Sequence, residues 1–184
     1  AACVKAMREA VKIPVTVKCR IGIDDQDAEA DFERFILTVA EAGCRSFIVH
    51  ARKAWLKGLS PKENREIPPL RYELAYRLKQ DFADLTICVN GGITRNEQIA
   101  AHLRQLDGVM IGREAYHNPW LMADWDQVFF AAAPMERSRE AVEAQMCDYM
   151  VRQAAEQGLV GLGAAGLAEH GDHHPTSRKL GAPS

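Results

Sequence analysis

The chain has 184 residues, nearly half of them apolar, which suffices for one domain with a real core and a small appendix. Its formal net charge of −2 gives no overall attraction to nucleic acid, so any RNA contact depends on local basic patches. The five cysteines are scattered and form no CxxC pair, which excludes a disulfide framework and favours a reduced, cytoplasmic protein. No apolar run is long enough to cross a bilayer, so we expect no membrane partner.

Short apolar runs that end in polar or glycine-rich tips alternate with helical patterns along the chain. Strands are predicted over residues 15–20, 46–50, 86–90 and 109–111. Helices are predicted over residues 1–12, 28–42, 71–81 and 96–103, from the GREAYHNPW junction to about residue 130, and over 136–157. Asp27 and Thr94 are the expected helix caps, and Gly43 is expected to end the second helix.

This alternation predicts an α/β fold with parallel strands, in which functional groups lie at the carboxyl ends of the strands. Only four strand ends are visible, and the chain opens within a helix without an initial Met, so we expect a fragment of a larger barrel. The predicted domains are a partial barrel over 1–133, the start of a helical domain over 134–157, and a disordered or aberrant tail over 158–184.

Two polar side chains mark the ends of the first two strands. Lys18 offers a fixed positive charge to an anionic ligand, and His50 offers an imidazole that can donate to a ligand oxygen at neutral pH. The alternatives are a lysine that extends to solvent beside Arg20 and a histidine that bonds to a neighbouring loop. Together, on adjacent strand ends, the two favour a binding site.

Two glycine-containing tips end the last two strands, and each precedes a helix. Asn90-Gly91-Gly92 and Gly112-Arg113 let backbone N–H groups approach a phosphate, and a helix N-terminus would add a favourable partial charge. In eightfold barrels the phosphate site typically lies on the last two βα loops. The pair therefore favours a phosphate site over two ordinary tight turns.

A long segment after the second strand is rich in basic residues and contains Trp55. This composition suits phosphate contacts and base stacking on RNA, although a solvated surface loop is the simpler interpretation. The basic residues are Arg52, Lys53, Lys57, Lys62 and Arg65. Near the C-terminus, His170, Asp172, His173 and His174 have metal-ligating side chains, but their low-complexity context predicts no metal site.

With these residues identified, the chain resembles the tRNA-dihydrouridine synthases, and within them the A-type bacterial subfamily. The segments VTVKCRIGIDD, FIVHARKAWLKGLSPKENREIPPL, VNGGI and DGVMIGREAYHNPW are close to that family's patterns. The resemblance covers about residues 1–130, and residues 136–157 more loosely. The HARKAWL and SPKENR stretch is its most specific part.

The resemblance implies a flavin-binding (β/α)8 TIM barrel followed by a small helical domain, with the visible strands as the fifth to eighth. It implies FMN-dependent reduction of uridine to 5,6-dihydrouridine in the D-loop of tRNA, with NADPH as reductant. Lys18 would stabilise negative charge near N1 and O2 of the reduced flavin. The implied FMN-binding residues are Lys18, His50, Asn90, Gly91, Gly92, Gly112 and Arg113, and the implied tRNA-binding residues are Lys62 and Arg65.

The family's proton-donating cysteine would belong to a preceding N-terminal half, so neither Cys3 nor Cys19 is assigned that role and no catalytic residue is assigned. Because half a barrel leaves two open sheet edges, we expect the chain to be unstable and inactive alone. Two alternatives stay open. One is an FMN barrel oxidoreductase of the dihydroorotate dehydrogenase type, and the other is a non-catalytic phosphate- or RNA-binding half-barrel. The basic segment with Trp55 favours RNA over a small acid as substrate.

Overall fold

The structure is a computed structural model that describes residues 1–26, 29–134 and 138–158. The chain divides into two compact units, residues 1–131 and residues 132–184. The predicted cap Asp27 and the histidine-containing tail lie outside the described residues. The candidate cofactor- and tRNA-binding residues all belong to the first unit.

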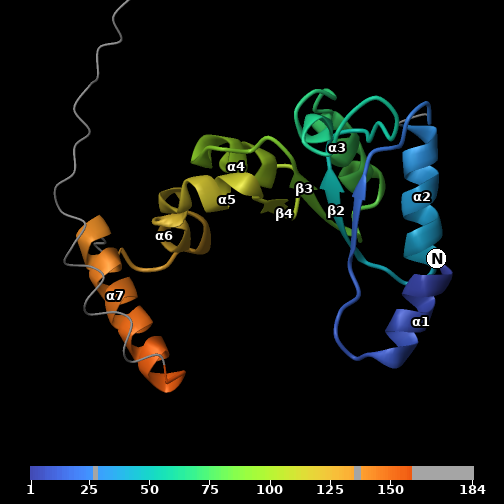
Figure 1. The fold of residues 1–184 in the computed structure, drawn as a ribbon. Coiled ribbons are helices and arrows are strands. Elements are labelled where there is room, and N and C mark those ends of the chain that lie inside the picture. Colours follow the sequence, from blue (N-terminus) through green and yellow to red (C-terminus); the bar gives the residue numbers. More distant parts are fainter. Residues whose placement is uncertain (27–28, 135–137, 159–184) are drawn as a thin grey trace, which may run out of the picture. The chain divides into compact units, whose positions relative to one another are not determined.

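Helices and strands alternate through the first unit, as the sequence pattern predicts (Figure 1). The strands are β1 (Val17–Arg20), β2 (Ser46–His50), β3 (Thr86–Asn90) and β4 (Gly108–Met110). The helices between and around them are α1 (Ala2–Ala10), α2 (Ala30–Glu41), α3 (Tyr72–Asp81), α4 (Asn96–Leu103), α5 (Arg113–His117) and α6 (Trp125–Phe130). Two short 3-10 helices, η1 (Glu63–Arg65) and η2 (Pro119–Met122), complete the unit, and α7 (Arg139–Glu156) is the described helix of the second unit.

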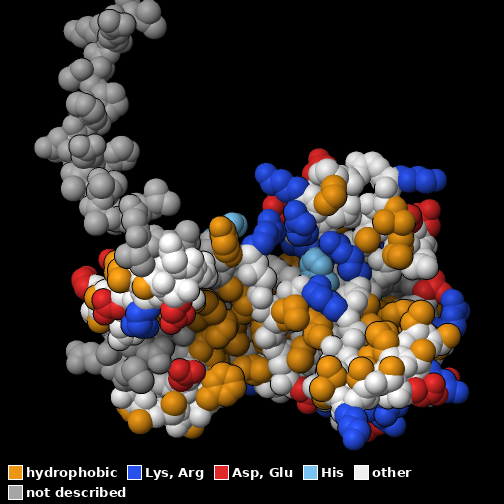
Figure 2. Space-filling view, turned by 60° about the horizontal axis from the view of Figure 1, so that its bottom comes forward, with side chains coloured by type: hydrophobic (Ala, Val, Ile, Leu, Met, Phe, Trp, Pro, Cys, Tyr) orange, Lys and Arg blue, Asp and Glu red, His pale blue; other side chains and the backbone are white. Residues whose placement is uncertain are grey.

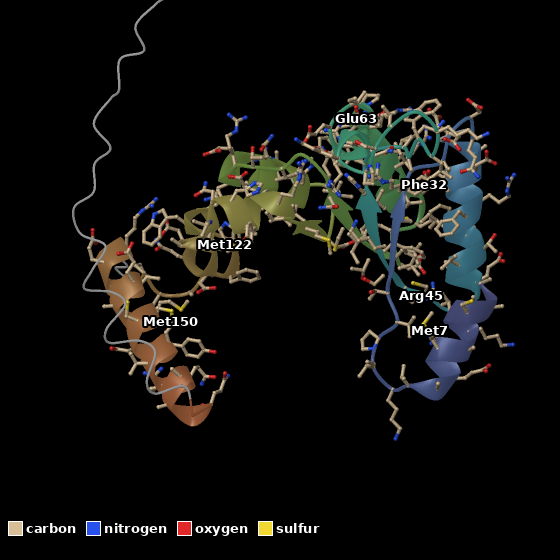
Figure 3. The ribbon with its side chains drawn as sticks, in the orientation of Figure 1. Met7, Phe32, Arg45, Glu63, Met122 and Met150 are labelled. Atoms are coloured by element: carbon tan, nitrogen blue, oxygen red, sulfur yellow. The ribbon has the colours of Figure 1, made fainter. Side chains whose placement is uncertain are left out.

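The four strands form one parallel sheet in the order β1-β2-β3-β4, which confirms the predicted α/β class. Parallel neighbours need a crossover connection, and α2, α3 and α4 supply the three crossovers. All carboxyl ends therefore lie along one edge of the sheet. Figure 3 shows this polarity, because Glu63 in the loop after β2 and Arg45 just before β2 lie at opposite ends of the strand.

The core forms where alternate strand residues meet the crossover helices. Phe47 and Val49 of β2 and Ile87 and Val89 of β3 are fully buried, as period-two alternation requires for one face of a sheet. Phe32 of α2 lies between its helix and the strands (Figure 3). Burying a side chain of this size contributes about 1.5–3 kcal/mol, so these few residues anchor the sheet against its helices.

Gly43 ends α2 as predicted, in a left-handed conformation with φ of 97°. The predicted cap Thr94 is wrong. The side-chain Oε1 of Gln98 accepts from the backbone N–H groups of both Thr94 (3.0 Å) and Arg95 (3.1 Å), so α4 starts at Asn96 with Arg95 as its N-cap. Gln98, in the first turn, thus reaches back to the backbone N–H groups that precede the helix, as the glutamine of a capping box does.

The single helix expected to run to about residue 130 is divided into α5, η2 and α6. Pro119 has no backbone N–H and stands at the start of η2, so a helix cannot pass through this position unbroken. In the second unit, the Ser138 side chain accepts from the Ala141 N–H at 3.1 Å and caps α7. Across the described ranges, the model has no helix with the length and apolarity needed to traverse a membrane.

Candidate functional site

The strand register brings polar residues into rows across one face of the sheet. Arg20 pairs with His50, His50 with Asn90, and Asn90 with Met110. Residues paired in register share a face of a sheet, so these four side chains stand in one row at the carboxyl edge. The row beneath contains Lys18, Ile48, Cys88 and Gly108. Lys18 and His50 are therefore brought to the same face, as the sequence predicts.

Two adjoining clefts open at this edge. The smaller, of about 140 Å³, lies over the ends of β3 and β4. It is lined by His50, Arg65, Asn90, Gly91, Gly92, Ile93, Thr94, Met110, Gly112, Arg113 and Glu114. The larger, of about 750 Å³, lies over β1 and β2 and is walled by the loop after β2. It is lined by Lys18, Cys19, Arg20, His50, Ala54, Trp55, Leu56, Leu59, Pro61, Asn64, Arg65 and Asn90.

Three residues, His50, Arg65 and Asn90, line both clefts, so the two form one continuous site. Six of the seven candidate cofactor-binding residues line the smaller cleft, and the seventh, Lys18, lines the larger one. Of the two candidate RNA-binding residues, Arg65 belongs to both clefts. Lys62 is exposed just before η1 and is not among the residues that line either cleft.

The turn after β3 requires glycine at two successive positions. Gly91 and Gly92 have φ values of 117° and 66°, which side-chain-bearing residues rarely adopt. A Cβ on Gly91 would lie 2.7 Å from Cδ2 of His50, and one on Gly92 would lie 2.6 Å from Cδ1 of Leu70. Among the described residues, the Gly92 N–H has no acceptor. The turn therefore exposes a backbone donor beside the smaller cleft.

At the second glycine tip, Gly112-Arg113, the structure does not support the expected contribution of a helix dipole to anion binding. Gly112 precedes α5, which has only five residues, so the aligned peptide dipoles are few. A Cβ on Gly112 would meet only Nδ2 of Asn90, at 3.9 Å, so glycine is not sterically required there. At this tip the positive charge comes from the Arg113 side chain, whose Nη1 lies 2.8 Å from Oε1 of Glu66.

His50 is nearly buried, with 9 % of its surface exposed, and it is surrounded by cations. Burial, as the largest cause, and the positive charges of Arg20, Lys18, Arg52 and Arg113 together lower the pKa of His50 to about 4. The imidazole is therefore neutral at pH 7 and can donate one hydrogen bond. Figure 2 shows lysine and arginine side chains grouped around a histidine on one face of the molecule. This concentration of positive charge is suited to an anion.

The loop between β2 and α3 is organised by Asn64 rather than freely solvated. Its Oδ1 accepts from the Trp55 N–H at 2.7 Å, and its Nδ2 donates to the Trp55 carbonyl at 2.7 Å. Nη1 of Arg20 donates to the carbonyls of Lys53 (2.8 Å) and Asn64 (2.9 Å), which ties the loop to β1. Nζ of Lys53 lies 5.7 Å from the ring centroid of Trp55. The loop thus presents Trp55 at the larger cleft in a defined conformation.

Sequence reasoning missed Arg20 and Asn64 as parts of the site. Arg20 follows Lys18 by two positions, so strand alternation alone places both on one face. Asn64 carries no comparable signal, because its three carbonyl partners in the loop depend on how the loop closes. Within the described ranges, no group of three or more His, Cys, Asp or Glu residues has a metal-binding arrangement.

Two cysteines, Cys3 and Cys19, do not contribute an activated thiol to the site. Cys19 is among the residues that line the larger cleft, but it pairs with Val49, so its side chain belongs to the opposite face from Lys18. Burial raises the pKa of Cys19 to about 12, although nearby Lys18 opposes the effect. Cys3 is exposed on α1 and lines neither cleft.

Comparison with known proteins shows which family the chain resembles in sequence. The family model described as "Dihydrouridine synthase (Dus)" matches residues 1–168. A tRNA-dihydrouridine(20/20a) synthase from Vibrio cholerae is 57 % identical over 157 residues, which cover 85 % of this chain and 48 % of the relative. Proteins of the same name are 57 % identical over 150 residues in Shewanella oneidensis (82 % and 45 % covered) and 52 % identical over 179 residues in Pseudomonas putida (97 % and 50 % covered). The chain spans about half the length of the curated relatives it matches.

Proposed function

The chain belongs to the dihydrouridine synthase family, and from that membership we propose that it forms the flavin-phosphate side of a cytoplasmic tRNA-dihydrouridine synthase. In this proposal its four parallel strands are the fifth to eighth strands of a (β/α)8 barrel, and α7 begins a helical RNA-binding domain. The protein would reduce uridine in the D-loop of tRNA to 5,6-dihydrouridine, with FMN as cofactor and NADPH as reductant. The observation that carries the proposal is the pair of clefts sharing His50, Arg65 and Asn90.

The residues of the smaller cleft fit a phosphate group. The guanidinium of Arg113 supplies charge and paired donors, and the Gly92 N–H is a backbone donor without an acceptor among the described residues. Gly91 allows the turn to approach closely, because it carries no Cβ to fill the space beside His50. We therefore assign the phosphate of FMN to Asn90, Gly91, Gly92, Gly112 and Arg113.

The larger cleft fits a planar ring with a negatively charged edge. Lys18 is exposed at its floor and would stabilise negative charge on the flavin pyrimidine ring. His50, neutral at pH 7, would donate a hydrogen bond without adding a further positive charge. FMN supplies hydride transfer to the C5–C6 bond of uracil when bound. The chain's own residues bind and orient the cofactor, and no proton donor is assigned among them.

The loop after β2 would contact the tRNA. Arg65 reaches the clefts, Lys62 is exposed before η1, and Trp55 offers a ring on which a base can stack. Phosphate contacts of this kind position an RNA without reading its sequence. We propose that Lys62 and Arg65 hold the backbone near the uridine, while Trp55 stacks beside it.

Cofactor binding is tested by titrating the chain with FMN and following flavin fluorescence. The proposal expects a yellow complex that Arg113→Ala and Lys18→Met weaken, whereas Arg45→Ala does not. Arg45 is a fitting control because it is an exposed arginine at the other end of β2, paired with Asp84 at 2.6 Å. A chain that stays colourless, or that binds equally well in all three variants, contradicts the assignment.

The RNA assignment is tested with unmodified tRNA. Lys62→Ala and Arg65→Ala should weaken tRNA binding in a gel-shift titration, and Arg45→Ala again serves as the control. Mass analysis of tRNA after incubation with NADPH then reports whether uracil gains two hydrogens, and because the chain spans about half the length of its relatives, we expect no gain from the chain alone. Flavin binding accompanied by reduction of a small carboxylic acid instead of tRNA would favour an enzyme of the dihydroorotate dehydrogenase type.

A further inference from the structure

A tyrosine outside both clefts holds the glycine turn from behind. Tyr72, the first residue of α3, donates from its hydroxyl to the carbonyl oxygen of Gly91 at 2.5 Å. A Cβ on Gly92 would lie 3.4 Å from the same hydroxyl. Tyr72 is not among the residues that line the smaller cleft, whereas Gly91 and Gly92 are. The phenol therefore contacts the side of the turn that faces away from the cleft.

This contact fixes the direction of a neighbouring donor. Within a trans peptide unit, the carbonyl of one residue and the N–H of the next point in opposite directions. Because the Gly91 carbonyl is held toward Tyr72, the Gly92 N–H points away from Tyr72. Gly91 and Gly92 tolerate this peptide orientation and its reversal almost equally, since both lack a Cβ. A glycine turn of this kind needs an external contact to remain in one orientation.

The phenol ring of Tyr72 is itself held by a buried histidine. The rings of Tyr72 and His102 meet edge to face, with centroids 4.5 Å apart. His102 is 6 % exposed, and its Nδ1 lies 2.7 Å from the hydroxyl of Tyr76. Burial raises the pKa of Tyr72, so the hydroxyl stays protonated and able to donate at neutral pH. The network thus links α3 and α4 to the turn between β3 and α4.

We propose that Tyr72 is a positioning residue for anion binding, which orients the Gly91–Gly92 peptide so that the Gly92 N–H is presented to the phosphate of the cofactor. This inference rests on the proposed function, because it concerns the same phosphate cleft. It extends that function to a residue on α3 that does not touch the cofactor.

The test compares two single-hydroxyl deletions on the same helix. Tyr72→Phe removes the bond to Gly91, while Tyr76→Phe removes only the bond to His102. Each variant of the full chain is titrated with FMN and with riboflavin, which lacks the phosphate. Losing one oriented hydrogen bond should cost Tyr72→Phe about three- to tenfold in FMN affinity and leave riboflavin affinity unchanged. Tyr76→Phe should keep both affinities.

The backbone ¹⁵N order parameter of Gly92, measured by NMR in the ligand-free protein, supplies a second readout, because it reports how narrowly the N–H direction is held. This order parameter should fall in Tyr72→Phe and stay unchanged in Tyr76→Phe, with both circular dichroism spectra matching the parent. Equal losses of affinity for FMN and riboflavin, or equal order parameters in the two variants, would overturn the inference. If the parent chain binds no FMN while the Gly92 order parameter still separates the variants, the proposed cofactor is refuted and the positioning role of Tyr72 stands.

Discussion

The low pKa of His50 predicts a loss of stability in mild acid. Replacing His50 by Gln removes the titrating group but keeps a side chain that can donate a hydrogen bond. In the folded chain the pKa of His50 is lowered from 6.5 to about 4, first by burial and then by the surrounding cations. In the unfolded chain the imidazole titrates normally, so the unfolded state binds more protons between these two values. Stability from this source is complete above about pH 6.5 and falls as the pH drops toward 4.

The size of the effect follows from the linkage between protonation and folding. One pKa unit corresponds to about 1.4 kcal/mol, and the shift of His50 gives up to about 2 kcal/mol of lost stability between about pH 7 and pH 5. His102 adds to the loss in the same direction, because burial lowers its pKa as well. The His50→Gln and His102→Gln variants therefore separate the two contributions.

The assay is urea unfolding at the two pH values, followed by tryptophan fluorescence, together with an NMR titration of the histidine ring protons. In His50→Gln, the free energy of unfolding should lose most of its dependence on pH. The ring-proton signal that is missing from this variant belongs to His50, and in the parent it should report a neutral imidazole down to about pH 5. Added inorganic phosphate should raise the pKa of His50, since an anion offsets the neighbouring cations. A His50 signal that titrates near 6.5 without phosphate would refute the reasoning.

Three further predictions concern the glycine turn after β3, the loop after β2 and the arginine of the smaller cleft. Both Gly92→Ala and Gly58→Ala place a side chain in the left-handed region, which costs roughly 1–2 kcal/mol of folding stability. Gly92→Ala should lose more than this amount, because its new Cβ would also clash with the Leu70 side chain. Urea unfolding of the two variants measures the difference. Asn64→Ala should speed tryptic cleavage of the loop and weaken tRNA binding, and unchanged proteolysis would argue against Asn64 as the residue that organises the loop. Glu66→Gln removes a carboxylate that binds Arg113 and whose pKa is lowered by that bond. Above this pKa the carboxylate competes with phosphate for Arg113, so the variant should bind FMN a few times more tightly. No gain of affinity in the FMN titration would mean that Glu66 does not compete with phosphate.

The sequence predicts the bounds of the two central strands and of α4 better than those of the edge strands β1 and β4. Strands β2 and β3 have the predicted bounds because buried alternate residues, such as Phe47 and Val89, are visible as apolar letters. Helix α4 has the predicted bounds, but its N-cap is Arg95 and not Thr94, and Gln98 in the first turn accepts from the backbone N–H groups of both residues. Such a contact depends on a side-chain rotamer, which the order of residues does not determine.

The same distinction applies to the site. Lys18 and His50 could be assigned to one edge, since parallel strands align their carboxyl ends. The contact of Tyr72 with the glycine turn could not be predicted from the sequence. It joins residues 19 positions apart, and it depends on how α3 and α4 pack. Sequence patterns thus locate the residues that strand geometry aligns, and they miss the residues that hold those in place.

Arg20 shows how the sheet determines the shape of the loop between β2 and α3. Its guanidinium donates to the carbonyls of Lys53 and Asn64, and so holds the segment between these two residues against β1. Closing a loop costs conformational entropy. The bonds from Arg20 offset this cost together with bonds inside the loop, which Asn64 makes to Trp55. The loop conformation is therefore set jointly by an arginine in the row of His50 and by an asparagine within the loop. For this reason Arg65, which follows Asn64 directly, stands at a fixed position beside His50, where a flavin ring and an RNA backbone would meet.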